Sequence, residues 1–80
     1  MSWRDWKPYE VAAYLRSQEV PEAVVDAFVR EGVSGSVIAE GLDDGMLEHE
    51  IGIAKKTHRS NVLGVLGRLT QEERRKLVFR

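Results

Sequence analysis

Apolar residues recur at intervals of three and four along most of the chain, which is the spacing of the buried face of an α-helix. The pattern predicts a first helix over residues 8–18, in which Val11 and Leu15 share a face. A second helix follows Pro21 and stops at Gly32, since glycine is common just beyond a helix end. The first third of the chain therefore predicts two amphipathic helices.

The rest of the chain predicts three more helices and no strands. Ser34 is placed to cap a short helix that ends at Gly41, and a fourth helix begins at Asp43–Asp44 and ends at Gly52. A long helix follows, with an inner stripe formed by Val62, Leu63, Leu66 and Leu69. Five helices with short connections and no hairpin signal predict an all-α fold, a compact five-helix bundle with a long C-terminal helix.

The length of 80 residues fits one small domain, and a composition of 42% hydrophobic and 31% charged residues is typical of a folded protein. We expect an N-terminal lead-in over residues 1–6, the domain over 7–69, and a helix extension or tail over 70–80. Of the two tryptophans, Trp6 is expected in the core, because it lies just before the start of the first helix at Pro8 and can fold back on that helix. Trp3 is expected to pack on the surface or to anchor a contact. In the tail, Leu77, Val78 and Phe79 either fold back on the bundle or form an exposed end.

Several classes of function find no support in the residues. The chain has no cysteine and two histidines, so we expect no disulfide, no metal site and no cofactor. No nucleophile motif or phosphate-binding glycine loop occurs, and we expect no enzyme and no small-molecule substrate. No apolar run is long enough for a membrane span, and the N-terminal residues lack the apolar stretch of a secretory signal. The absence of cysteine favours an intracellular protein, cytoplasmic or nuclear.

Charge is distributed unevenly, although the net charge is only −1. Residues 31–50 contain six acids and no lysine or arginine, whereas residues 51–80 contain eight bases and two acids. Lys55, Lys56 and Arg59 crowd the start of the last helix, where the helix dipole already contributes positive charge. This placement suits an anionic partner. The alternative is that these cations are ordinary solvated surface charges.

The order and spacing of the apolar positions resemble the sterile alpha motif (SAM) family from Trp6 to Leu69. The C-terminal part carries the most specific match, Gly52-Ile53-x-Lys55-x-x-His58-Arg59-x-x-Val62-Leu63-x-x-Leu66-x-x-Leu69. The structural core that follows from the pattern and the resemblance consists of Trp6, Val11, Leu15, Phe28, Val33, Ile38, Leu47, His58, Val62, Leu66 and Leu69. The chain departs from the family pattern at Ser34, at Thr57 and in the interval from Leu47 to Gly52. This interval is one residue longer than is usual in the family.

The resemblance implies a protein–protein interaction module that joins another copy, or another SAM domain, head to tail. In that arrangement an acidic mid-loop surface receives the basic end-helix surface of the next molecule, and open helical polymers can result because the two surfaces differ. The end-helix surface would comprise Ile53, Ala54, Lys55, Lys56 and Arg59. The mid-loop surface would comprise Glu40, Asp43, Asp44, Met46, Glu48 and Glu50.

Other interpretations remain open at this stage. The resemblance also permits RNA-hairpin binding, with the same cations contacting phosphates, although the acidic segment beside them would repel a polyanion. A monomeric domain without a partner of its own kind is a third alternative. His58 is either a pH-sensitive contact at the basic end or, as the resemblance implies, a structural residue near the tryptophan.

Overall fold

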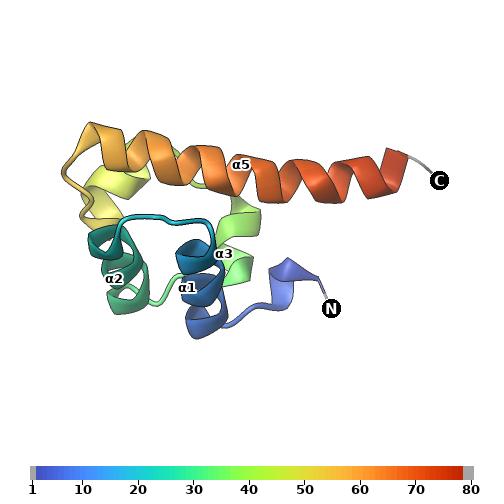
Figure 1. Cartoon of the computed structure of the whole chain (residues 1–80), viewed down its shortest axis with the longest axis horizontal. Coiled ribbons are helices and arrows are strands. Elements are labelled where there is room, and N and C mark those ends of the chain that lie inside the picture. Colours follow the sequence, from blue (N-terminus) through green and yellow to red (C-terminus); the bar gives the residue numbers. More distant parts are fainter. Residues whose placement is uncertain (1, 79–80) are drawn as a thin grey trace.

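The computed structural model describes residues 2–78, with side chains as far as Gln71, and this part of the chain is helical without strands. The elements in chain order are η1 (Trp3–Asp5), α1 (Pro8–Ser17), α2 (Glu22–Arg30), α3 (Gly35–Glu40), α4 (Asp44–Met46), η2 (Leu47–Ile51) and α5 (Lys56–Val78). The shorter helices gather against the first half of α5 (Figure 1). The all-α fold with five helices and a long C-terminal helix is confirmed.

Local sequence explains the boundaries of the first two α-helices. Pro8 occupies the first position of α1, and the Glu10 carboxylate accepts a hydrogen bond from the Lys7 backbone N–H at 2.9 Å. At the other end of α2, Gly32 adopts a φ of +63°, a left-handed conformation that glycine reaches without steric cost. The two helices pack against each other through their apolar faces.

The two tryptophans exchange their expected roles. Trp3 is only 8% exposed, whereas Trp6 is half-buried and packs against Tyr14, with ring centroids 5.3 Å apart and ring planes tilted by 47°. The expectation rested on local helix-start geometry, but the 3-10 turn η1 folds back and places Trp3 against α3. Gly35 makes this approach possible, because its backbone N–H donates to the Trp6 carbonyl at 2.8 Å and it has no Cβ to strike the Trp3 carbonyl.

The segment from α3 to η2 contains the main irregularity of the fold. Ser34 precedes α3 as expected, yet its hydroxyl pairs with Ser36 and does not cap the helix. Asp43 does cap α4, since its Oδ1 accepts a hydrogen bond from Met46 N at 2.8 Å. The next turn, η2, is a π-helix closed by a bond from the N–H of Gly52 to the carbonyl of Leu47. A π-turn holds one more residue than an α-turn, which accommodates the longer interval in this segment.

One apolar core joins all the larger elements. Nine of the eleven expected core residues are buried: Val11, Leu15, Phe28, Val33, Ile38, Leu47, Val62, Leu66 and Leu69. The two remaining residues, Trp6 and His58, are half-buried. The core also contains residues outside that set, namely Trp3, Ala12, Val20, Val24, Val25, Ala27, Ile51, Ile53 and Val65.

Helix α5 is longer than the body of the domain requires. Its first half covers the core, and its second half extends past the other helices toward the C-terminus (Figure 1). The backbone of the expected tail continues this helix as far as Val78. The expectation that Leu77, Val78 and Phe79 either fold back on the bundle or form an exposed end concerns side chains outside the described residues.

Candidate functional site

The predicted end-helix surface lies where the chain turns from η2 into α5. Ala54, Lys55 and Lys56 are exposed at this turn. The first hydrogen bond of the helix runs from Arg59 N to the Lys55 carbonyl at 3.1 Å, so the N–H groups of the preceding turn have no partner within the helix. Two lysines and the positive end of the helix dipole therefore lie together on the surface.

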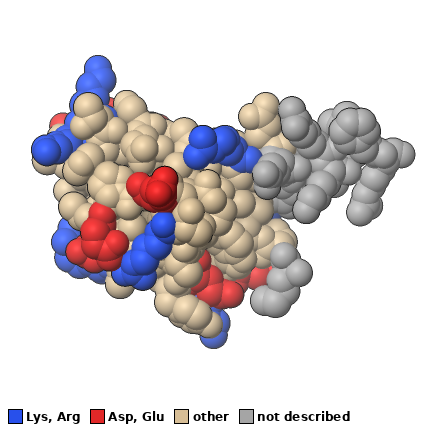
Figure 2. Space-filling view, in the orientation of Figure 1, with Lys and Arg blue, Asp and Glu red and all other residues tan. Residues whose placement is uncertain are grey.

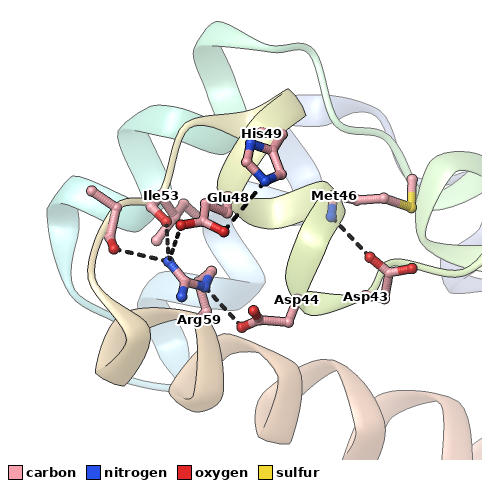
Figure 3. A network of polar contacts seen from close by, with 8 residues as sticks. Asp43, Asp44, Met46, Glu48, His49, Ile53 and Arg59 are labelled. Atoms are coloured by element: carbon pink, nitrogen blue, oxygen red, sulfur yellow. Dashed lines mark hydrogen bonds and ion pairs between the residues drawn. The ribbon is translucent and has the colours of Figure 1, made fainter.

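Arg59 does not belong to this exposed set, contrary to the expectation from the sequence. It is 6% exposed, and its guanidinium turns inward between α4 and α5 (Figure 3). Nε donates to Asp44 Oδ1 at 2.8 Å, and Nη1 donates to the carbonyls of Ile53 and Ala54 at 2.9 and 2.8 Å. Glu48 lies 3.8 Å from Nη1. A guanidinium has donors in several directions, and here it uses them to hold the turn before α5.

Ile53, expected on the end-helix surface, and His58, expected in the core, also lie elsewhere than predicted. Ile53 is 4% exposed and forms part of the core, so it supports the turn from beneath. His58 is half-buried and lines a hollow between α2 and the start of α5, a hollow with no tryptophan in its wall. Its side chain therefore borders the same hollow as Ala23, Ala27 and Arg30 of α2.

This basic hollow, as we name it, has a volume of about 410 Å³. Its wall consists of Ala23, Val24, Ala27, Arg30, Gly52, Ile53, Ala54, Lys55 and His58. Small apolar side chains form most of the wall, and Arg30, Lys55 and His58 supply its basic groups. The sequence analysis missed the contribution of α2, since nothing in the spacing of residues 23–30 indicates that they meet the start of α5.

The predicted mid-loop surface is formed by α3, α4 and η2. Glu40, Asp43, Asp44, Glu48 and Glu50 are all exposed, and Met46 is half-buried among them. Three of these acids already have partners within the chain, and of these Asp43 caps α4 and Asp44 pairs with Arg59. Glu48 lies 3.5 Å from His49 in addition to its contact with Arg59. Glu40 and Glu50 are the acids of this surface with no bond of this kind in the described structure.

A second hollow, the acidic hollow, opens beside the mid-loop surface and has a volume of about 230 Å³. Its wall consists of Glu31, Val33, Val37, Leu42, Met46, Glu50 and Ile51. Two carboxylates thus flank an apolar floor, which suits a side chain with an apolar stem and a cationic tip. Of these carboxylates the sequence analysis named Glu50 and missed Glu31.

Charge on the surface is organised by region. Figure 2 shows basic side chains projecting at the end of the molecule where α5 begins, while acidic and basic side chains alternate across the rest of that face. The basic and acidic hollows carry opposite charge in different parts of one chain.

The described residues form neither a metal site nor a membrane-spanning helix. Among residues 2–71, no three histidine, cysteine or acidic side chains are grouped so as to hold a metal ion. Over the same part of the chain, none of the helices combines the length and the apolarity that crossing a membrane requires. The two surfaces and their hollows are therefore the features to be compared with known proteins.

Comparison with protein families identifies the domain. The profile of the SAM domain (sterile alpha motif) matches residues 5–69, which covers every element from the end of η1 to the core half of α5. Searches of curated proteins and of solved structures give no match. SAM domains are protein–protein interaction modules and not enzymes. With its helical architecture and a match over most of its length, this chain belongs to the SAM domain family.

Proposed function

We propose that this SAM domain associates head to tail with a second copy or with another SAM domain. The end-helix surface of one molecule, here Ala54, Lys55 and Lys56 with the basic hollow, meets the mid-loop surface of the next. Because the two surfaces differ, a pair of molecules keeps one free surface of each kind, and repetition gives an open helical polymer. Arg59 acts inside each molecule and is not a contact residue in this proposal.

The observation that carries the proposal is the presence on one chain of two hollows with apolar walls and opposite charge. Lys55 and Arg30 border one hollow, and Glu50 and Glu31 border the other. Apolar contact supplies affinity in such an interface, while complementary charge guides the encounter and fixes the register. A set of solvated surface charges would have no need of an apolar hollow beside each patch.

Sedimentation velocity over a range of concentrations and at two salt concentrations tests the proposal. We expect the wild-type weight-average mass to rise with concentration in low salt, and to fall in high salt because exposed charges are screened. Lys56→Glu should yield monomers by reversing charge at the end-helix surface. Glu50→Lys should do the same at the mid-loop surface, and it disturbs neither the α4 cap nor the Arg59 pair.

A mixture of these two variants distinguishes the proposed geometry from general charge attraction. Each variant retains one intact surface, so an equimolar mixture should form a discrete dimer and nothing larger. Arg68→Glu is a suitable control, because this exposed residue of α5 lines neither hollow and its reversal changes the net charge by the same amount. A wild-type domain that stays monomeric at several hundred micromolar in low salt would overturn the proposal.

RNA-hairpin binding is the alternative proposal, and the grouping of Arg30, Lys55 and His58 around one hollow is the observation in its favour. A labelled RNA hairpin titrated with the domain should then show a rise in fluorescence anisotropy that decreases steeply with salt, because phosphate contacts release counterions. Lys56→Glu should abolish that rise, and Glu50→Lys should leave it or strengthen it. No rise in low salt would dismiss RNA.

A further inference from the structure

The C-terminal end of α2 contributes one charged residue to each hollow. Arg30, the last residue of α2, lines the basic hollow, and Glu31, the next residue, lines the acidic hollow. Two consecutive residues thus border different hollows. Neither residue is among the binding residues expected from the sequence, because they lie ten and nine residues before Glu40, the first residue of the expected mid-loop surface.

Within the chain these two side chains pair only loosely with each other. Arg30 Nε lies 3.6 Å from Glu31 Oε2, and the two side chains are 62% and 42% exposed. No shorter bond from either side chain is present in the described structure. An ion pair with this separation and exposure contributes little to stability, so a stronger partner can replace it at low cost.

Helix geometry also leaves both side chains free to change partner. The backbone N–H of Glu31 bonds to the Ala27 carbonyl, and the chain then turns away at Gly32, so the helix end is held by its backbone. The side chains take no part in that arrangement. The backbone bonds hold the Cα positions of the two residues, while their charged groups remain exposed to a partner.

We propose that Arg30 and Glu31 are binding residues of opposite interfaces in the head-to-tail assembly, each exchanging its internal partner for a charge on a second copy. Arg30 forms an ion pair with a carboxylate on the mid-loop surface of the neighbour. Glu31 and Glu50 together bind the ammonium group of a lysine from the start of the neighbour's α5. The aliphatic part of that lysine lies on the apolar floor between the two carboxylates. This inference rests on the proposed head-to-tail function and adds α2 to both surfaces.

The test uses the whole chain and two single variants, Arg30→Glu and Glu31→Arg, in sedimentation velocity at low salt. Each should weaken self-association at least about tenfold, because a favourable charge contact becomes a repulsive one. An equimolar mixture should restore a discrete dimer, since Arg30→Glu leaves the acidic hollow intact and Glu31→Arg leaves the basic hollow intact. Arg30→Gln, which only removes the charge, should have a smaller effect.

Matched controls separate this inference from the proposed function. Arg68→Glu and Asp26→Arg reverse exposed charges that line neither hollow, and both should associate like the wild type. Circular dichroism and thermal melts show whether each variant is folded. If Lys56→Glu abolishes association while both α2 variants match their controls, the role of α2 is wrong and the head-to-tail proposal stands. If the wild type itself is monomeric, both fail.

Discussion

Arg59 donates a hydrogen bond to Asp44 across 2.8 Å, and this contact joins the start of α5 to the start of α4. The same guanidinium donates to the carbonyls of Ile53 and Ala54, so it also holds the turn that precedes α5. Arg59, which was predicted to lie on a binding surface, is thus a structural link between α4 and α5 (Figure 3).

Removing this link should destabilise the fold. Arg59→Ala leaves two backbone carbonyls without their donor, and each unsatisfied buried group costs about 1–3 kcal/mol. Asp44 remains half-exposed and can return to water, so we expect a total loss of about 2–4 kcal/mol, or roughly 10–25 °C in the melting temperature. Urea and thermal unfolding provide the measurement.

Arg16→Ala is the matched control for that change. Arg16 also bonds to a carboxylate, at 3.0 Å from Glu22, but both side chains are more than half exposed. Exposed pairs contribute little, so the unfolding midpoint should scarcely move. Equal midpoints for the Arg59 and Arg16 variants would contradict the structural role of Arg59.

The close approach of η1 to α3 makes Gly35 sensitive to any side chain. A Cβ at this position would strike the Trp3 carbonyl oxygen and lie 2.9 Å from the Arg4 carbonyl carbon, and backbone atoms cannot turn aside as a flexible side chain can. Gly35→Ala should therefore displace η1, lower stability by about 1–3 kcal/mol and expose Trp3. Acrylamide quenching of fluorescence in a Trp6→Phe background reports on Trp3 alone. Unchanged quenching would show that η1 stays docked.

Gly64 in α5 should show the opposite behaviour. It lies in the helix interior, it is exposed, and a Cβ there would meet nothing within 4 Å. Gly64→Ala should raise the free energy of unfolding by about 0.5–1 kcal/mol, because glycine loses more conformational freedom than alanine in a helix. Chemical unfolding measures the gain. A loss of stability would mean that the surface of α5 at this position is not open.

The cap of α4 makes a further prediction. Asp43→Ala removes the acceptor for Met46 N and should cost about 1 kcal/mol of stability. Asp26→Ala removes an exposed carboxylate from α2 and serves as the control, with an expected change close to zero. If the two variants unfold at the same urea concentration, the cap contributes nothing to the stability of α4.

Much of this fold is predictable from the spacing of apolar residues. Val11 and Leu15 in α1 and Val62 and Leu66 in α5 lie on buried faces as a period of 3.6 requires, because in each pair the residues are one turn apart. Glycine and aspartate also identify helix ends correctly at Gly52 and Asp43, where the signal is local.

Features that depend on contacts between distant segments are not predictable in this way. A run of cations does not reveal that Arg59 turns inward, since its carbonyl partners are created only when the turn before α5 forms. Trp3 is buried by η1, whose path depends on the missing side chain at Gly35. Arg30 and Glu31 reach the hollows through the packing of α2, which no local pattern encodes.

In the proposed head-to-tail assembly, the position of Arg59 would have a consequence beyond the single domain. In a head-to-tail chain, the rotation from one subunit to the next depends on the angle between the two binding surfaces of a single molecule. Arg59 fastens α4 to α5, so it helps to set that angle. A small change in this fastening would be repeated at every subunit and would alter the pitch of the whole filament. One buried guanidinium would thus influence a dimension many times the 40 Å length of the domain.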